Sequence, residues 1–315
     1  MLFDLHNRTA MKIIRTFPVP VCGIALALSA VGNLLQDYHE ILKTVPGITG
    51  AAILLMFVVR CVSNRQLLRE DLHAPITASV FGTFPMALML QSGYIQPLSA
   101  SLGLMIWYLG VLLHFVLILW FTRQFLLRFQ LSQLFVSWYV VYIGIVLASI
   151  TSPEFGTSTV GVAAFWFGLI SFIIGFAPVI IRYIKLDTPP PAKPIICIYA
   201  APFSFLLYGA LQIELPLSSH VILTVWIVAT AFYLFAFGNM FHLITKKFYP
   251  SRAAFTFPFV ISAAVTKHVA SLNIFTGSLQ RLRALSATAE ILIACTLIVY
   301  VTTRLFVFIL HQNAA

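Results

Sequence analysis

The amino-acid sequence predicts an all-α membrane protein of ten transmembrane helices, arranged as five consecutive helical hairpins. Apolar residues make up 60% of the 315-residue chain and charged residues 9%, which leaves too little polar surface for a soluble protein. A bilayer core of ~30 Å needs about 20 apolar residues per helix. Ten stretches meet this length, at about 17–35, 44–62, 75–93, 97–121, 132–151, 157–181, 194–213, 219–243, 253–271 and 285–310. We expect uninterrupted helices, since backbone groups in lipid must be hydrogen-bonded within the segment.

Basic residues alternate from one gap between these stretches to the next. Of the 19 Lys and Arg residues, 14 lie at the N-terminus or in every second gap: Arg8, Lys12, Arg15, Arg60, Arg65, Arg69, Arg123, Arg128, Arg182, Lys185, Lys193, Lys246, Lys247 and Arg252. The intervening gaps hold Lys43, Arg281 and Arg283. Because Lys and Arg near helix ends are retained in the cytoplasm, we expect a multi-pass protein of the cell (inner or plasma) membrane with both termini cytoplasmic.

The odd-numbered stretches recur at a nearly constant period. They begin near Phe17, Pro75, Ser132, Pro194 and Ala253, at spacings of 57 to 62 residues. A fixed period indicates a repeated structural unit. Residues 1–315 are therefore interpreted as a single transmembrane domain built from five similar hairpins.

The two helices of each hairpin differ in composition. Internal prolines occur in the odd stretches at Pro20, Pro85, Pro202 and Pro258, against Pro178 in an even one. Pro bends a helix where neighbours or a cavity satisfy the freed carbonyl, and small residues allow close backbone approach. We therefore expect the odd helices to surround a central pore and the even ones, richer in Leu, Ile, Phe and Trp, to face lipid. The alternative is a solid bundle cemented by small residues.

Several other protein classes are disfavoured. Ala25-Leu26-Ala27 resembles a signal-peptide cleavage site, but the apolar run continues to Leu35, so an uncleaved first helix is the better interpretation. The four cysteines have no spacing suited to zinc or a disulfide framework, which favours core positions: Cys22, Cys61, Cys197 and Cys295. Without a Walker loop, Rossmann glycines or HExxH, we expect no cofactor and no metal. The net charge of +10 suits membrane lipid and anions and requires no nucleic acid.

Residues 252–268, in the ninth stretch, form the most informative local segment. Pro258 lacks an N–H and clashes with the carbonyl of Ala254, which predicts a kink. Phe257 precedes the kink, where its ring would turn into the axis and block ions by sterics and dewetting. The residues that follow are small enough to leave a passage: Ser262, Ala263, Ala264 and Thr266. Since the chain has 28 Phe residues, simple packing is the alternative role of Phe257.

Two segments resemble one known family. Residues 254–258, Ala-Phe-Thr-Phe-Pro, are similar to the ninth helix of the tellurite-resistance/C4-dicarboxylate transporter (TDT) family, which includes TehA and the plant guard-cell slow anion channel. The first-helix entry at residues 17–27, followed by Gly32-Asn33, is similar to the N-terminal pattern of the same family. Together with ten helices in five hairpins, the resemblance covers essentially the whole chain.

The resemblance implies a pore formed by the five inner helices of each protomer and occluded by a Phe of the ninth helix. The matching run is Thr256-Phe257-Pro258, so the gate residue is Phe257 and not Phe255 or Phe259. Further pore-lining candidates lie on the inner helices, at Gly23, Pro85, Pro202, Ser262 and Thr266. Family members are homotrimers with one pore per subunit. This chain has only short segments beside its outermost helices, so control through long phosphorylated tails is not carried over.

Three ionisable residues lie well within predicted helices: Lys267, Glu290 and Arg304. Charge in a bilayer is costly unless paired or hydrated, so each is a functional candidate. At ~1.5 Å per residue, Lys267 and Glu290 lie near the outer surface, and we expect a structural ion pair between them. The alternatives are an anion-attracting Lys267 in the outer vestibule or a proton-coupling Glu290. We expect Arg304 to snorkel or to tether a neighbouring helix, and His114 and His242 to pack.

The sequence and the resemblance favour an anion channel or transport protein that passes small inorganic or organic anions. Helix ends and basic inner loops supply diffuse positive potential without tight binding. The alternative is a proton-linked secondary carrier for C4-dicarboxylates such as malate, which needs a midplane site and alternating access. An enzyme is not expected, because the inner helices hold almost no clustered Asp, Glu, His or Cys.

Overall fold

The computed structural model describes residues 14, 16–272 and 278–314, and in this part of the chain the regular elements are all helical. Eight helices among them are long and apolar enough to cross a membrane, or nine if the bent pair Arg65–His73 and Pro75–Ile95 is one span; Val21–Leu35 is a shorter apolar helix. The all-α, multi-pass membrane class is thereby confirmed. Three residues of the predicted charge pattern, Arg8, Lys12 and Arg15, lie outside the described residues.

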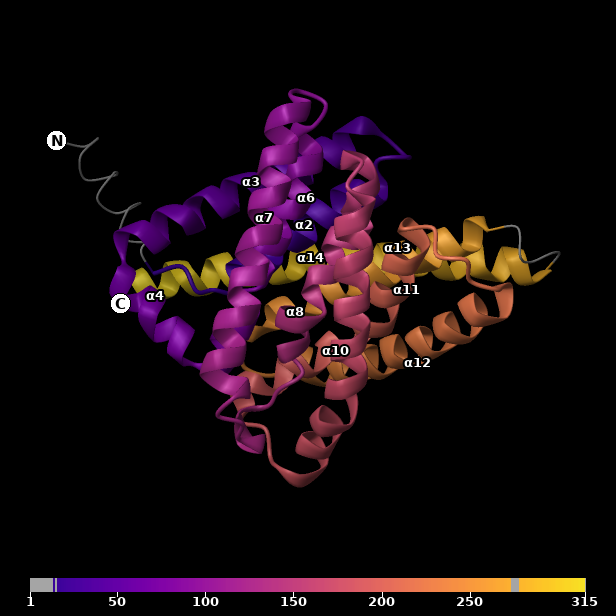
Figure 1. The fold of residues 1–315 in the computed structure, drawn as a ribbon. Coiled ribbons are helices and arrows are strands. Elements are labelled where there is room, and N and C mark those ends of the chain that lie inside the picture. Colours follow the sequence, from indigo (N-terminus) through magenta and orange to yellow (C-terminus); the bar gives the residue numbers. More distant parts are fainter. Residues whose placement is uncertain (1–13, 15, 273–277, 315) are drawn as a thin grey trace.

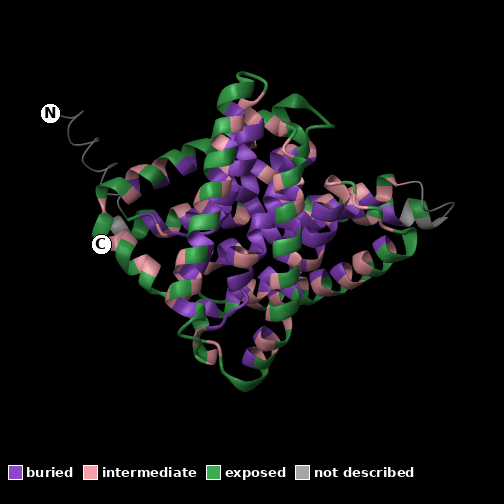
Figure 2. Ribbon diagram, in the orientation of Figure 1, coloured by how far each residue is buried: buried purple, intermediate pink, exposed green. Residues whose placement is uncertain are grey.

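Five long outer helices show 22% to 33% burial over their apolar windows. They are α3 (Glu40–Ser63), α7 (Ala100–Phe121) with the π-helical turn η1 (Thr122–Leu126), α10 (Ser158–Lys185), α12 (Ser219–Ile244) and α14 (Ser278–Ala314). Their outward faces carry exposed apolar side chains, for example Leu55, Ile174 and Leu234. Figure 2 shows these helices largely green and the middle of the bundle purple. An apolar surface of this extent is the surface that lipid covers.

Five inner segments lie between the outer helices. They are α2 (Val21–Leu35); α5 (Pro75–Val80) with α6 (Thr83–Ile95); α8 (Trp138–Tyr142), η3 (Gly144–Val146), α9 (Leu147–Thr151) and η4 (Ser152–Phe155); η5 (Pro190–Ala200) with α11 (Pro202–Gln212); and η6 (Pro250–Phe255) with α13 (Phe257–Ser271). The last three are 67% to 72% buried, and 12 of the 15 residues of α2 are buried. The odd-numbered stretches are therefore the more deeply buried ones.

Uninterrupted helices were expected, and for most of the inner segments this is wrong. They change between α- and 3₁₀-helix, and a proline begins α5, η5, α11 and η6. The freed backbone groups find partners inside the protein: the carbonyl of Ala200, beside one break, accepts hydrogen bonds from Ser262 Oγ at 2.9 Å and Ser204 Oγ at 3.3 Å. Irregular backbone at membrane depth is tolerated where protein surrounds it. Proline does not mark the inner segments alone, because Pro46 and Pro178 lie inside α3 and α10.

The inner segments contact one another in a closed order. Contacts join α2 to α6, α6 to α9, α9 to α11, α11 to α13, and α13 back to α2. Each outer helix packs against the inner segment that precedes it in the sequence, as α3 does on α2 and α14 on α13. Figure 1 shows the short inner elements between the long outer helices.

One helix was not expected. Residues of the gap after α3 form α4 (Arg65–His73), which bends by 104° into the following span. Asn64 caps α4 by accepting a hydrogen bond from the backbone N–H of Leu67 at 3.1 Å. Arg60, at the end of α3, pairs with Asp71 of α4. This pair ties α4 to the bundle near the start of α5. A further 3₁₀ turn, η2 (Leu131–Gln133), leads into α8.

Candidate functional site

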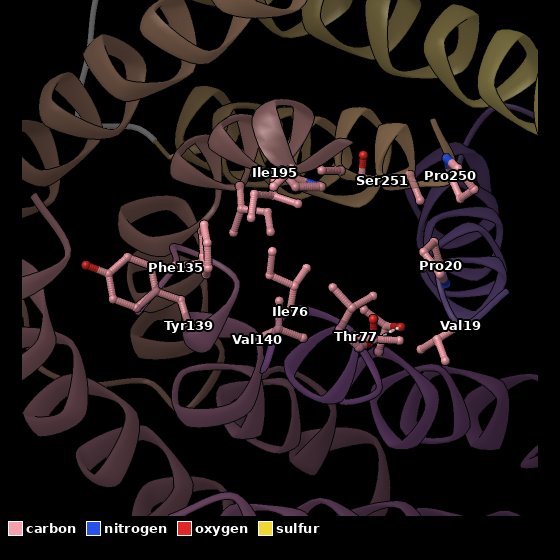
Figure 3. A pocket seen from close by; sticks show the side chains of 18 of the residues that line it. Val19, Pro20, Ile76, Thr77, Phe135, Tyr139, Val140, Ile195, Pro250 and Ser251 are labelled. Carbon is pink, nitrogen blue, oxygen red and sulfur yellow. Dashed lines mark hydrogen bonds between the residues drawn. The ribbon is translucent and has the colours of Figure 1, made fainter. Parts of the chain in front are cut away.

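A cavity of about 730 Å³ opens where the five inner segments begin. We call it the vestibule. Figure 3 shows Pro20, which directly precedes α2, and Ile76, Tyr139, Ile195 and Pro250 of the other four inner segments arranged around its open space. Its walls are mainly apolar, and eight of its lining residues are prolines: Pro18, Pro20, Pro75, Pro189, Pro191, Pro202, Pro250 and Pro258. Asp71 is the one charged residue among those that line it.

Phe257 lines the vestibule together with Pro258. Phe257 is 8% exposed, and its ring meets Phe205 of α11 edge to face, with the ring centroids 5.8 Å apart. Gly23 of α2 and Thr83 of α6 also line the cavity. Two aromatic rings from neighbouring inner segments therefore stand beside the small residues of the other walls.

The local sequence determines where Phe257 lies. The 3₁₀ turn η6 ends at Phe255, and Thr256 leaves the helical region with φ −106° and ψ −90°. Thr256 Oγ1 donates a hydrogen bond to the carbonyl of Ala253 at 2.7 Å, which stabilises the break. Pro258 then occupies the first turn of α13, where its missing N–H costs no hydrogen bond. The expected kink at Pro258 is thus a full break at Thr256 followed by a new helix.

The predicted pore-lining residues fall into two groups. Gly23 and Pro202 line the vestibule. Pro85, Ser262 and Thr266 are buried but are not among the residues that line it. Ser262 hydrogen-bonds the carbonyl of Ala200, as described above, and so supports the break before α11.

The expected ion pair between Lys267 and Glu290 is wrong. Lys267 Nζ donates to Asp37 Oδ2 at 2.9 Å and to the carbonyl of Leu34 at 2.8 Å, at the end of α2. Glu290 is 6% exposed, and its carboxylate accepts from Thr266 Oγ1 at 3.2 Å. The reason is helical geometry: consecutive residues point about 100° apart on an α-helix. Thr266 therefore faces α14 while Lys267 faces α2.

Two of the other intramembrane candidates, His114 and Arg304, have packing contacts. His114 is buried on α7, and its Nε2 lies 2.9 Å from the carbonyl oxygen of Val141 in α8. The Arg304 guanidinium lies over the ring of Phe248, 5.8 Å from its centroid, in the loop between α12 and η6 and not on a neighbouring helix. His242 is exposed at the end of α12 and does not pack in the interior. The four cysteines are free, and Cys22 and Cys197 are buried. Among the described residues no group of His, Cys, Asp and Glu is arranged to hold a metal ion.

Three arginines that the charge pattern assigned to loops are almost completely buried. Arg60 and Arg252 are 1% exposed and Arg182 is 2% exposed. Arg252 donates to the carbonyls of Leu243 at 2.7 Å and Lys246 at 2.5 Å, at the end of α12. Arg182 donates to Thr188 Oγ1 at 2.6 Å. The sequence did not predict these roles, because an arginine at a helix end occupies the same position in the sequence whether its side chain faces water or donates hydrogen bonds to the end of a helix.

Comparison with known protein families gives a match over nearly the whole chain. The family model described as SLAC1, voltage-dependent anion channel, matches residues 16–310. No curated protein sequence matches the chain significantly. The family match confirms the resemblance to the TDT family that the first-helix and ninth-helix segments indicate. With its apolar helices and its vestibule, the chain is a multi-pass membrane protein, and it belongs to the SLAC1 family of voltage-dependent anion channels.

Proposed function

We propose that the protein passes small anions through a pore along the axis of the five inner segments and that Phe257 occludes this pore. The observation that carries the proposal is the vestibule, which is walled by all five inner segments and reaches Phe257. The closed order of contacts from α2 to α13 and back supports an axial pathway. In this proposal α2 and the span α5–α6, which follows the bend after α4, complete a set of ten crossings in five hairpins.

The inner helices supply the preference for anions. The first turns of α2, α6, α11 and α13 contribute Gly23, Thr83, Pro202 and Phe257 to the vestibule wall. A helix N-terminus carries a partial positive charge, so four such ends lower the energy of an anion there. Among the described residues, the mostly apolar walls hold no lysine or arginine, and the carboxylate of Asp71 is paired with Arg60. An anion is therefore attracted by the helix ends without being trapped. A phenyl ring across an apolar passage blocks ions by sterics and dewetting.

The basic residues set the proposed orientation. Lys193, Lys246 and Lys247 lie at the end of the bundle where the inner segments begin. Lys and Arg near helix ends are retained in the cytoplasm. In this proposal the protein therefore lies in the cell membrane, its vestibule opens to the cytoplasm, and both termini lie on the cytoplasmic side. We further propose a homotrimer with one pore per subunit, in contact with membrane lipid.

The test is ionic current across planar bilayers that contain the purified protein. Phe257→Ala should produce anion-selective currents in chloride, nitrate and malate gradients that are far larger than those of the wild type, because the ring no longer fills the passage. The matched control is Phe259→Ala, since Phe259 is buried on the same helix and packs on Tyr233 of α12, with ring centroids 5.3 Å apart. Equal currents in the wild type and both variants would contradict the gate.

A proton-linked carrier for C4-dicarboxylates is the second candidate. It is favoured by Glu290, a buried carboxylate whose hydrogen-bond partner Thr266 lies on the inner helix α13. A carrier would lose malate uptake driven by a pH gradient in Glu290→Gln, which keeps the shape but cannot exchange a proton. Glu40→Gln, the same substitution at an exposed carboxylate at the start of α3, is the control. Undiminished pH-driven uptake in Glu290→Gln would remove Glu290 from proton coupling.

A further inference from the structure

A second cavity lies beside the vestibule at the same end of the bundle. It has a volume of about 400 Å³ and lies between the ends of α10 and α12 and the starts of η5 and η6. Its lining includes four lysine or arginine side chains and a histidine: Lys193, Lys246, Lys247, Arg252 and His242. Among the residues that the structure describes, no aspartate or glutamate lines it. We call this cavity the basic pocket.

The positive charge of the basic pocket is not neutralised by acidic side chains. Lys193, Lys246 and Lys247 are exposed, and neither of the ion pairs identified in the described part of the chain involves them. Arg252 is fixed at the back, where it donates to three carbonyls at the end of α12. Those carbonyls would otherwise repel an anion. The pocket therefore combines one buried, hydrogen-bonded arginine with three exposed lysines.

This arrangement matches a phosphate group better than a halide or a carboxylate. A phosphate carries concentrated charge on several acceptor oxygens, and lysine binds it as a point charge with three donors. Thr188, Asn239 and Tyr249 add neutral hydrogen-bonding groups to the wall. The volume is that of a small-molecule site. Basic pockets between helices at the cytoplasmic surface are also sites for phospholipid headgroups.

The wall between the basic pocket and the vestibule is thin. Tyr249 lines both cavities. In the start of η5, Pro190 and Lys193 line the basic pocket, while Pro189 and Pro191 line the vestibule. Ser251 Oγ of η6 donates to the carbonyl of Pro191 at 2.5 Å and holds the two 3₁₀ segments together. An occupant of the basic pocket thus contacts η6, whose next residues are Thr256 and the ring of Phe257.

We infer that the basic pocket binds the phosphate group of an anionic ligand, and that binding acts on Phe257 through η6. The ligand is a free phosphate compound or the headgroup of an anionic phospholipid. The second half of the inference rests on the proposed gate at Phe257. The binding half stands on the pocket alone.

Binding is tested directly on the purified protein by calorimetric titration. The probes are inorganic pyrophosphate and, separately, nanodiscs of phosphatidylcholine with or without phosphatidic acid. Lys193→Gln/Lys246→Gln/Lys247→Gln should weaken binding by about fivefold for each lysine removed. Binding of pyrophosphate identifies a soluble ligand, and binding only of nanodiscs that contain phosphatidic acid identifies a lipid headgroup.

The matched control removes three exposed charges from the same end of the molecule outside the pocket: Arg123→Gln/Arg128→Gln/Lys185→Gln. It should retain wild-type affinity. An equal loss of affinity in the control would mean that the general positive potential of this end of the protein attracts the probes, and would overturn the site. The site would also be overturned if the wild type bound neither probe.

Coupling is tested without any current. In a variant whose four native cysteines are replaced, Phe257→Cys is modified by a charged thiol reagent from the vestibule side. The ligand that binds should change the modification rate several-fold, and the change should vanish in the triple lysine variant. An unchanged rate at saturating ligand would overturn the coupling. Because the readout does not depend on permeation, its failure is distinct from failure of the proposed function.

Discussion

The outer helix α12 and the inner segment η6–α13 are neighbours in the sequence and in contact, but they are built differently. α12 runs for 26 residues without a break, and 22% of its apolar window is buried. η6–α13 is 72% buried and changes from 3₁₀- to α-helix at Thr256. Lipid offers no hydrogen bonds, so the outer helix must satisfy its own backbone. The inner segment can break because Thr256 Oγ1 donates to the carbonyl of Ala253 at the break, and this break sets the position of Phe257 beside the vestibule.

The largest effect we predict comes from a proline placed in a lipid-facing helix, whose backbone must satisfy its own hydrogen bonds. Ile227→Pro places a proline in α12 at a residue that is 54% exposed. It should lower the free energy of unfolding by about 3 kcal/mol or more, because no neighbour satisfies the lost backbone hydrogen bond. Pro258→Ala, in the first turn of the inner helix α13, should cost less than about 1 kcal/mol. Thermal unfolding in lipid nanodiscs compares the two, with Ile227→Ala as the control.

The second prediction concerns how each region tolerates loss of an arginine. Arg252→Gln leaves carbonyls at the end of α12 without donors and should destabilise the protein by about 2–3 kcal/mol. Arg304→Gln, on the exposed side of α14, should change stability by less than about 1 kcal/mol. Thermal unfolding in lipid nanodiscs compares the two variants. Equal losses of stability would show that burial of Arg252 does not determine its contribution to the free energy of unfolding.

The third and smallest effect compares two glycines on outer helices. A Cβ at Gly168 of α10 would overlap the side chain of Val146, which belongs to an inner segment, whereas a Cβ at Gly238 of α12 meets nothing within 4 Å. Gly168→Ala should cost about 1–2 kcal/mol through overpacking, because the β-branched Val146 cannot move aside easily. Gly238→Ala should be neutral or stabilise by up to about 1 kcal/mol. A neutral Gly168→Ala would mean that inner and outer helices are not tightly packed there.

Much of the fold could be predicted because apolar length and charge spacing are local properties of the chain. The stretch expected at 219–243 is observed as Ser219–Ile244, and that expected at 157–181 as Ser158–Lys185. The amphipathic helix α4 was missed because its charged residues, Arg65 and Arg69, were read as a loop. Burial of Arg252 also escaped sequence reasoning, since its partners are backbone carbonyls, which have no sequence signature.

By itself the sequence determined the membrane class, the deeper burial of the odd-numbered stretches and the family, because each depends on residue type at a known spacing. The assignment of Phe257 as the gate comes from the family resemblance and stays a prediction. Only the tertiary structure decided which side chains meet. It paired Lys267 with Asp37 rather than Glu290, and it brought Lys193 and Lys247, which are far apart in the sequence, to one basic pocket. The physical reason is that a partner's identity depends on helix rotation and on where helices break. A rotation of about 100° between consecutive residues is enough to exchange one partner for another.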